Sequence, residues 1–102
     1  MNLKDEFDPI REWAFEKQIF DKASQETQFL KLMEEVGELS EAMQEGSYSK
    51  FVDAIGDCVV VLTILAKMKG FNIEHCINSV YAVISKREGK MVNGVFVKEN
   101  NK

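Results

Sequence analysis

Seven carboxylate side chains lie between residues 34 and 57, a stretch with one basic side chain, Lys50. On a helical wheel four of them form one stripe: Glu34, Glu38, Glu41 and Glu45. Glu35 lies on the flank of this stripe, one turn before Glu38. The plain interpretation is a solvated acidic face, as on many surface helices. The chemical interpretation is a cluster of oxygen ligands, which suits hard cations such as Mg²⁺ or Mn²⁺.

Two further carboxylates favour the chemical interpretation. Asp53 and Asp57 are four residues apart and share one face of a segment that is otherwise strongly apolar. Buried carboxylates must be paired, protonated or bound to a metal, because an isolated buried charge is very costly. If a short connection at 46–48 makes the flanking helices antiparallel, the glutamates approach Asp57 or Asp53. We expect Mg²⁺ or Mn²⁺ there rather than zinc, and hydrolysis of a phosphate ester or anhydride.

The elements that must position these groups follow from the apolar spacing and the turn residues. Asp8 and Pro9 are typical of a helix N-cap and first helical position, and Ser24 of a second N-cap. Asn93-Gly94 between two apolar runs predicts a hairpin with a type I′ turn. We predict one all-α domain over residues 1–102, a four-helix bundle-like subunit with a short C-terminal hairpin or extended tail. The predicted helices cover about 9–20, 26–45, 49–68 and 73–87, and the hairpin about 90–98.

Composition narrows the function classes. The net charge of −4 argues against a nucleic-acid-binding surface, which needs a basic face. Cys58 and Cys76 do not suggest a disulfide framework, so we expect reduced thiols in a cytoplasmic protein. The most apolar run, 58–66, is far shorter than the roughly 20 residues of a membrane span. The small size and the apolar third helix favour a homo-oligomer.

Residues 34–39 (Glu-Glu-Val-Gly-Glu-Leu) and 53–57 (Asp-Ala-Ile-Gly-Asp) together resemble the MazG family of all-α nucleoside triphosphate pyrophosphohydrolases. The family pattern is Glu-Glu-x-x-Glu, a spacer, and then Glu-x-x-Asp. The similarity extends from Trp13 to about Phe96 and is closest to the short, phage-type members. One position departs from the pattern, because the first residue of Glu-x-x-Asp falls on Ala54. Asp53, one residue earlier, could replace the missing ligand.

The resemblance implies an Mg²⁺-dependent reaction that yields a nucleoside monophosphate and pyrophosphate. It implies that the metal ligands and catalytic residues are Glu34, Glu35, Glu38 and Asp57, with Asp53 as a further metal ligand. One of the three glutamates would position or deprotonate the attacking water. The resemblance also implies a homo-dimer or homo-tetramer.

Six side chains are candidates for substrate contact: Lys31, Lys86, Arg87, Lys90, Trp13 and Gln28. The lysines and the arginine would bind the polyphosphate, although Lys31 also fits a helix ion pair and the other three fit cations at a helix C-terminus. The indole would stack on the base unless it belongs to the core. The glutamine would read a base or ribose edge unless it is an ordinary surface residue. The hairpin could close over this site or over that of a neighbouring subunit.

Two other functions stay open. The same cluster could serve a different nucleotide, such as dUTP, dCTP or a signalling nucleotide. Alternatively the chain is a non-catalytic or weakly catalytic helical module whose degenerate metal site binds a nucleotide or a protein partner. Ala54 is the feature that keeps this second alternative open.

Overall fold

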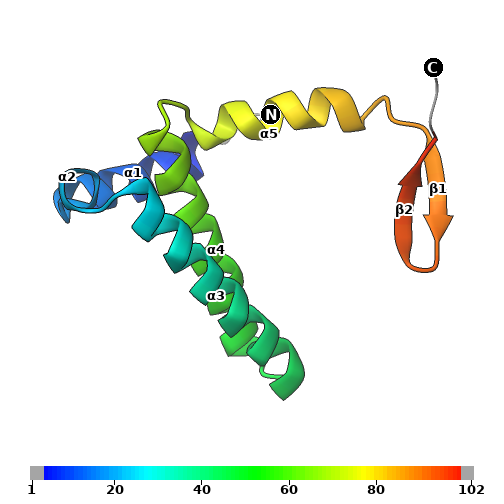
Figure 1. Cartoon of the computed structure of the whole chain (residues 1–102), viewed down its shortest axis with the longest axis horizontal. Helices are drawn as coiled ribbons and strands as arrows, with labels where there is room; N and C mark the ends of the chain where they lie inside the picture. The colour runs from blue at the N-terminus through cyan, green and yellow to red at the C-terminus, as the bar shows by residue number, and fades with distance from the viewer. Residues whose placement is uncertain (1–3, 100–102) are drawn as a thin grey trace.

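Helices form most of the chain, as predicted, and a hairpin follows them (Figure 1). The computed structural model describes residues 4–99. Its elements are α1 (Lys4–Glu16), α2 (Ile19–Lys22), α3 (Gln25–Glu45), α4 (Tyr48–Met68), α5 (Ile73–Ile84), β1 (Gly89–Val92) and β2 (Val95–Lys98). No helix in this part of the chain is long and apolar enough to cross a membrane.

The two longest helices, α3 and α4, lie side by side and antiparallel (Figure 1). Ala42 and Ala54 are buried between them, and these small side chains allow the two backbones to approach closely. Gly46 adopts a left-handed conformation with φ of 70° and ends α3, so the chain reverses within a few residues. The predicted antiparallel packing through a short connection is therefore confirmed, and it places the acidic segment of α3 beside α4.

The start of α3 has a reciprocal cap at Ser24. The Ser24 hydroxyl accepts a hydrogen bond from the backbone N–H of Thr27, and the Thr27 hydroxyl oxygen accepts one from the N–H of Ser24. We expect Ser24→Ala to lower the free energy of unfolding by about 1 kcal/mol, because two backbone donors at the helix end depend on this pair. Urea unfolding measures the loss. Ser79→Ala in α5 is the control and should be nearly neutral, since Ser79 is exposed and alanine is the better helix former.

The N-terminal helix differs from the prediction of a helix over 9–20. It begins earlier, at Lys4, ends at Glu16, and holds Pro9 in its interior rather than at its first position. A proline this near the helix start removes one backbone hydrogen bond, and tertiary contacts of the helix can compensate for that loss. Gln18 then takes a left-handed conformation with φ of 62°, which separates α1 from the single turn of α2.

Arg11 joins α1 to the start of α5. Its two terminal nitrogens donate to the two carboxylate oxygens of Glu74 at 2.8 and 2.6 Å, and one of them also pairs with Asp8. Both side chains of the Arg11–Glu74 pair are largely buried. These charge-assisted hydrogen bonds raise the pKa of the Arg11 guanidinium above its usual value, so the pair stays charged.

The last helix is shorter than the predicted 73–87, and α5 ends at Ile84. The hairpin forms with Met91 opposite Phe96, and its turn residues Asn93 and Gly94 have φ of 51° and 82°. Positive φ at both positions is the type I′ geometry that was predicted. We call residues 73–98 the arm. It leads away from the α3–α4 pair, so the long helices do not close into one bundle within this chain (Figure 1).

Candidate metal centre

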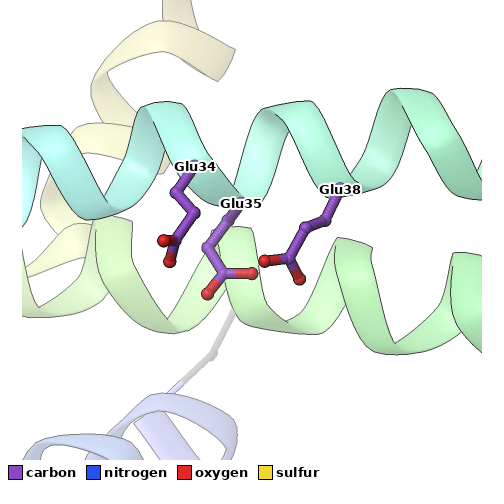
Figure 2. A group of neighbouring side chains, drawn as sticks. All are labelled: Glu34, Glu35 and Glu38. Atoms are coloured by element: carbon purple, nitrogen blue, oxygen red, sulfur yellow. The ribbon is translucent and has the colours of Figure 1, made fainter.

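Three glutamates of α3 lie close together beside α4 (Figure 2). Glu34, Glu35 and Glu38 each offer one carboxylate oxygen, and these oxygens all lie within 4.8 Å of one another. Helical spacing explains the grouping, because residues three and four apart lie on adjacent turns of the same side. It is the one such group of potential ligands found within residues 4–99.

Glu35 is the buried member of this cluster. The residue is 5% exposed, and its Oε1 atom is buried without a hydrogen-bond partner. Its other oxygen, Oε2, lies 3.3 Å from Nζ of Lys31, which also binds Glu34 at 2.8 Å. A buried carboxylate oxygen that lacks a donor is costly. A divalent cation at this position would satisfy it, so the residues fit a metal.

The charges of the cluster also favour a bound cation. The pKa of the Glu38 carboxyl is raised, chiefly by the negative charge of Glu35 and then by desolvation and by Glu34. Lys31 acts in the opposite direction but does not cancel the effect. The Cys58 thiol also has a raised pKa, first from burial and then from the charge of nearby carboxylates. The site therefore holds more negative charge than its one lysine neutralises.

The raised pKa of Glu38 predicts a pH dependence in the metal-free protein. A carboxyl with a higher pKa in the folded state binds its proton more tightly there than in the unfolded chain. Its stabilising contribution therefore grows as pH falls from 7 through the folded pKa, and is complete below the ordinary value of about 4.3. Urea unfolding with chelator should show that Glu38→Gln removes this component. Equal pH profiles for the two proteins would contradict the raised pKa.

The two aspartates of α4 lie beside the cluster but outside its tight group of oxygens. Asp53, Asp57 and Glu38 line one concavity of about 470 Å³. The charge of Asp57 also contributes to the raised pKa of Glu38. Both aspartates are exposed, so the argument that they must be buried was wrong. The reason is that this flank of α4 continues the open acidic flank of α3 instead of facing into a bundle.

Ala54 also lines this concavity and is itself buried against α3. A glutamate at position 54 would therefore project from the interface of the two helices toward Glu38 and Asp57. Alanine leaves that space free and supplies no oxygen. Asp53 faces the same concavity from the adjacent position, with a shorter side chain than glutamate.

The predicted substrate-binding residues are distributed over three parts of the structure. Lys31 is part of the cluster through its ion pairs. Gln28 is partly buried two turns before Glu35, and its Oε1 atom is buried without a partner. Trp13 is 46% exposed on α1, so it does not belong to the buried core. The structure does not bring the remaining three to the cluster: Lys86, Arg87 and Lys90 lie on the arm.

Three cations of the arm line a cavity away from the carboxylate cluster. Lys86, Arg87 and Lys98 lie around a space of about 650 Å³ between the end of α5 and the hairpin. Glu88 and Glu99 also line this space. The arm therefore carries a notch lined by three cations and two carboxylates, at the junction of α5 and the strands.

A larger cavity, about 840 Å³, lies between α1, α2 and the end of α4, and the sequence did not indicate it. Phe15, Phe20, Lys67 and Met68 are among its lining residues, together with Arg11. Its walls come from segments more than 40 residues apart, so no local spacing identifies it. The only available signal was the unusual density of aromatic and charged residues in α1.

The segment that carries the glutamate cluster is similar to a known protein family. A family model described as the MazG nucleotide pyrophosphohydrolase domain matches residues 23–92, which include α3, α4, α5 and β1. This match covers more than half of the chain. The chain belongs to the MazG nucleotide pyrophosphohydrolase family. The predicted resemblance to this family is confirmed.

One phage relative is similar over part of its length. An uncharacterized 18.2 kDa protein from the rep–hol intergenic region of Haemophilus phage HP1 (strain HP1c1) is 41% identical over 58 residues. That alignment covers 57% of this chain and 36% of the relative, so the chain spans little more than a third of that protein. No solved structure matches the chain.

Proposed function

We propose that this MazG chain hydrolyses nucleoside triphosphates to nucleoside monophosphate and pyrophosphate, with Mg²⁺ as the metal and Mn²⁺ as a possible substitute. One observation carries the proposal. Three carboxylate oxygens from α3 converge within 4.8 Å, and one of the contributing side chains, Glu35, is buried with an oxygen that has no hydrogen-bond partner. Hard divalent cations prefer such all-oxygen sites, and Mg²⁺ completes its shell with water and phosphate oxygens.

Within this proposal the carboxylates have two roles, metal binding and activation of the attacking water. Glu34, Glu35 and Glu38 would hold the metal. Asp57 of α4 would be a ligand as well, with Asp53 as a further one. A bound divalent cation neutralises phosphate charge and makes a coordinated water more acidic. Glu38 is exposed and has a raised pKa, so it is suited to position the attacking water and accept its proton.

The remaining residues of the proposal contact the substrate. Lys31 lies in the cluster and supports the phosphates nearest to the metal. Gln28 has a buried amide oxygen that can accept from the base or ribose, and Trp13 offers an exposed ring for stacking. In a homo-oligomer the polyphosphate would be bound by the arm cations of a neighbouring copy, because those of the same chain do not lie at the cluster. We propose a homo-oligomer in a reducing, cytoplasmic setting, with a nucleotide and no nucleic acid or membrane as its partner.

A nucleotide panel tests this function. Each canonical ribo- and deoxyribonucleoside triphosphate, with dUTP and dCTP included, is incubated with Mg²⁺ or Mn²⁺, and pyrophosphate is measured separately from phosphate. We expect metal-dependent pyrophosphate that chelator abolishes. Release of phosphate alone would indicate another anhydride hydrolase.

The alternative is a module that binds nucleotide without turnover, and Ala54 in the wall of the acidic concavity supports it. Saturable metal-dependent nucleotide binding, measured by calorimetry, with no product across the panel would favour this alternative. Ala54→Glu is the matched variant, because it restores the family pattern. If that variant gains turnover that the wild type lacks, position 54 explains the difference.

A further inference from the structure

The cavity between α1, α2 and the end of α4 is large enough to hold a small molecule. Its volume is about 840 Å³, and ligand pockets typically measure about 300–1,000 Å³. Its lining residues come from α1, α2, the start of α3 and the end of α4. We call this cavity the α1 pocket. It shares no described lining residue with the concavity beside the glutamate cluster.

The α1 pocket lies at a distance from the metal centre. Gln25 of α3 lines it and precedes Glu34 by nine residues, which corresponds to about 14 Å along the helix. Lys67 of α4 also lines it and follows Asp57 by ten residues, or about 15 Å. A ligand in this pocket therefore does not depend on the carboxylates that we assign to the metal.

The apolar part of the pocket wall is aromatic. Phe15, Phe20 and Met68 line the pocket, and Phe15 is 73% exposed. A ligand that covers this ring removes apolar surface from water, which favours binding. The face of an aromatic ring also attracts a cation. These walls suit a molecule that has an apolar or aromatic body.

The charges around the pocket are mostly negative. Its charged lining residues are three carboxylates and two cations: Asp8, Glu12, Glu16, Arg11 and Lys67. Arg11 is already paired with two carboxylates, those of Asp8 and Glu74. The C-terminal end of α4 adds the negative end of a helix dipole. A cation in the pocket is therefore favoured, and an anion such as a phosphate group is repelled.

Two of these carboxylates are free to bind a ligand. Glu12 and Glu16 lie one turn apart on α1, and both are exposed. Neither forms an ion pair with another side chain in the part of the chain that the structure describes. Two neighbouring carboxylates without a cation are a suitable binding site for an ammonium group.

The pocket is held in place without a ligand. Arg11 is 10% exposed in its side chain, and its hydrogen bonds of 2.8 and 2.6 Å to Glu74 fix α1 against α5. On the opposite wall, the reciprocal hydrogen bonds of Ser24 and Thr27 fix the start of α3. Because these groups are already ordered, a ligand loses little affinity to the ordering of the protein.

We propose that the α1 pocket binds a small organic amine, a molecule with an ammonium group on an aromatic or aliphatic body. The body packs against Phe15, Phe20 and Met68, and the ammonium group binds Glu12 and Glu16 at the rim. This site goes beyond the proposed hydrolysis and does not rest on it, because it uses none of the metal-binding carboxylates.

Three indole compounds test the preference for a cation. Tryptamine, tryptophol and indole-3-acetate share a ring and differ mainly in a positive, neutral or negative end group. Each is titrated into ¹⁵N-labelled protein with chelator, and the amide NMR signals of α1, α2 and residues 65–68 report binding. We expect tryptamine to bind at least about fivefold more tightly than tryptophol, and indole-3-acetate to bind most weakly. Equal affinities for tryptamine and tryptophol, shifts confined to other parts of the chain, or no saturable binding of tryptamine would each overturn the proposal.

Variants of the rim identify the groups responsible. In Glu12→Gln/Glu16→Gln, we expect tryptamine to bind within about twofold of tryptophol, whose own affinity should not change. Glu6→Gln is the matched control, since Glu6 is an exposed carboxylate of α1 outside the pocket lining, and it should keep the wild-type preference. Phe15→Ala should weaken both compounds. A double variant that still prefers tryptamine as strongly as the wild type would contradict the assignment of the ammonium site.

Two further titrations distinguish other occupants of the pocket. A mixture of the canonical nucleoside triphosphates with Mg²⁺ should not displace tryptamine. Displacement would assign the pocket to the nucleotide and overturn the proposal of a separate amine site. The affinity for tryptamine should also be the same at low and high protein concentration. An affinity that falls as the protein concentration rises would mean that another copy of the chain fills the pocket, which would equally overturn the proposal.

Discussion

Glu38→Gln is expected to lower metal-dependent pyrophosphate release by at least about 100-fold, because the variant loses both a ligand charge and the proton acceptor that we assign to the cluster. The metal-free variant should fold, and its stability at neutral pH should equal or exceed that of the wild type. The physical reason is that Glu35 and Glu34 repel the Glu38 carboxylate in the folded state. Turnover under saturating Mg²⁺ and urea unfolding with chelator are the two measurements.

Glu26→Gln is the matched control for this prediction. Glu26 lies in the first turn of the same helix, outside the cluster, so the control changes the same functional group without a ligand role. We expect the control to keep its turnover. A Glu38→Gln protein with wild-type turnover would remove Glu38 from the site, and a strongly destabilised one would mean that the acidic cluster is structural.

Arg11→Met should have the largest effect on stability among changes away from the metal centre. The guanidinium makes two hydrogen bonds to Glu74 and one to Asp8, and its side chain is 10% exposed. Loss of this charged partner should lower the free energy of unfolding by about 2 kcal/mol. For a domain of this size, that loss corresponds to a fall in melting temperature on the order of 10 °C.

Calorimetry with two further variants identifies why Arg11→Met lowers the free energy of unfolding. Lys17→Met removes an exposed cation from the region after α1 and should change the stability by less than about 0.5 kcal/mol. The double variant Arg11→Met/Glu74→Met should recover part of the loss, because it removes a largely buried carboxylate that the single variant leaves without its arginine. If the double variant is no more stable than Arg11→Met, the side chain of Arg11 stabilises the fold by packing rather than by its charge.

Local spacing was sufficient to predict the carboxylate cluster. Glu34, Glu35 and Glu38 converge because they lie on consecutive turns of one helix, and helix geometry is the same wherever the helix is. The cap at Ser24 and the turn at Asn93-Gly94 were also predicted from the sequence, because caps and tight turns depend on a few neighbouring residues. The antiparallel arrangement of α3 and α4 followed from the short connection between them.

Predictions that depended on burial were less successful. Asp53 and Asp57 were expected to be buried because the helix around them is apolar, yet both are exposed. An apolar helix on its own does not show which of its flanks has a neighbour. Pro9 was placed at the first helical position by a local preference, but α1 continues through it. Local preferences of this kind are weak compared with tertiary contacts.

By itself, the sequence determined the helices, the hairpin turn, the carboxylate cluster and the family, since each depends on residue types at short range. Only the tertiary structure decided where the arm lies and therefore which residues share a site. The sequence around Lys86 and Arg87 does not indicate how far these residues lie from Glu38. That distance depends on the direction of α5, which is set by its junction with α1 and α4. That junction includes Arg11 and Glu74, 63 residues apart, and no pattern along the chain links them.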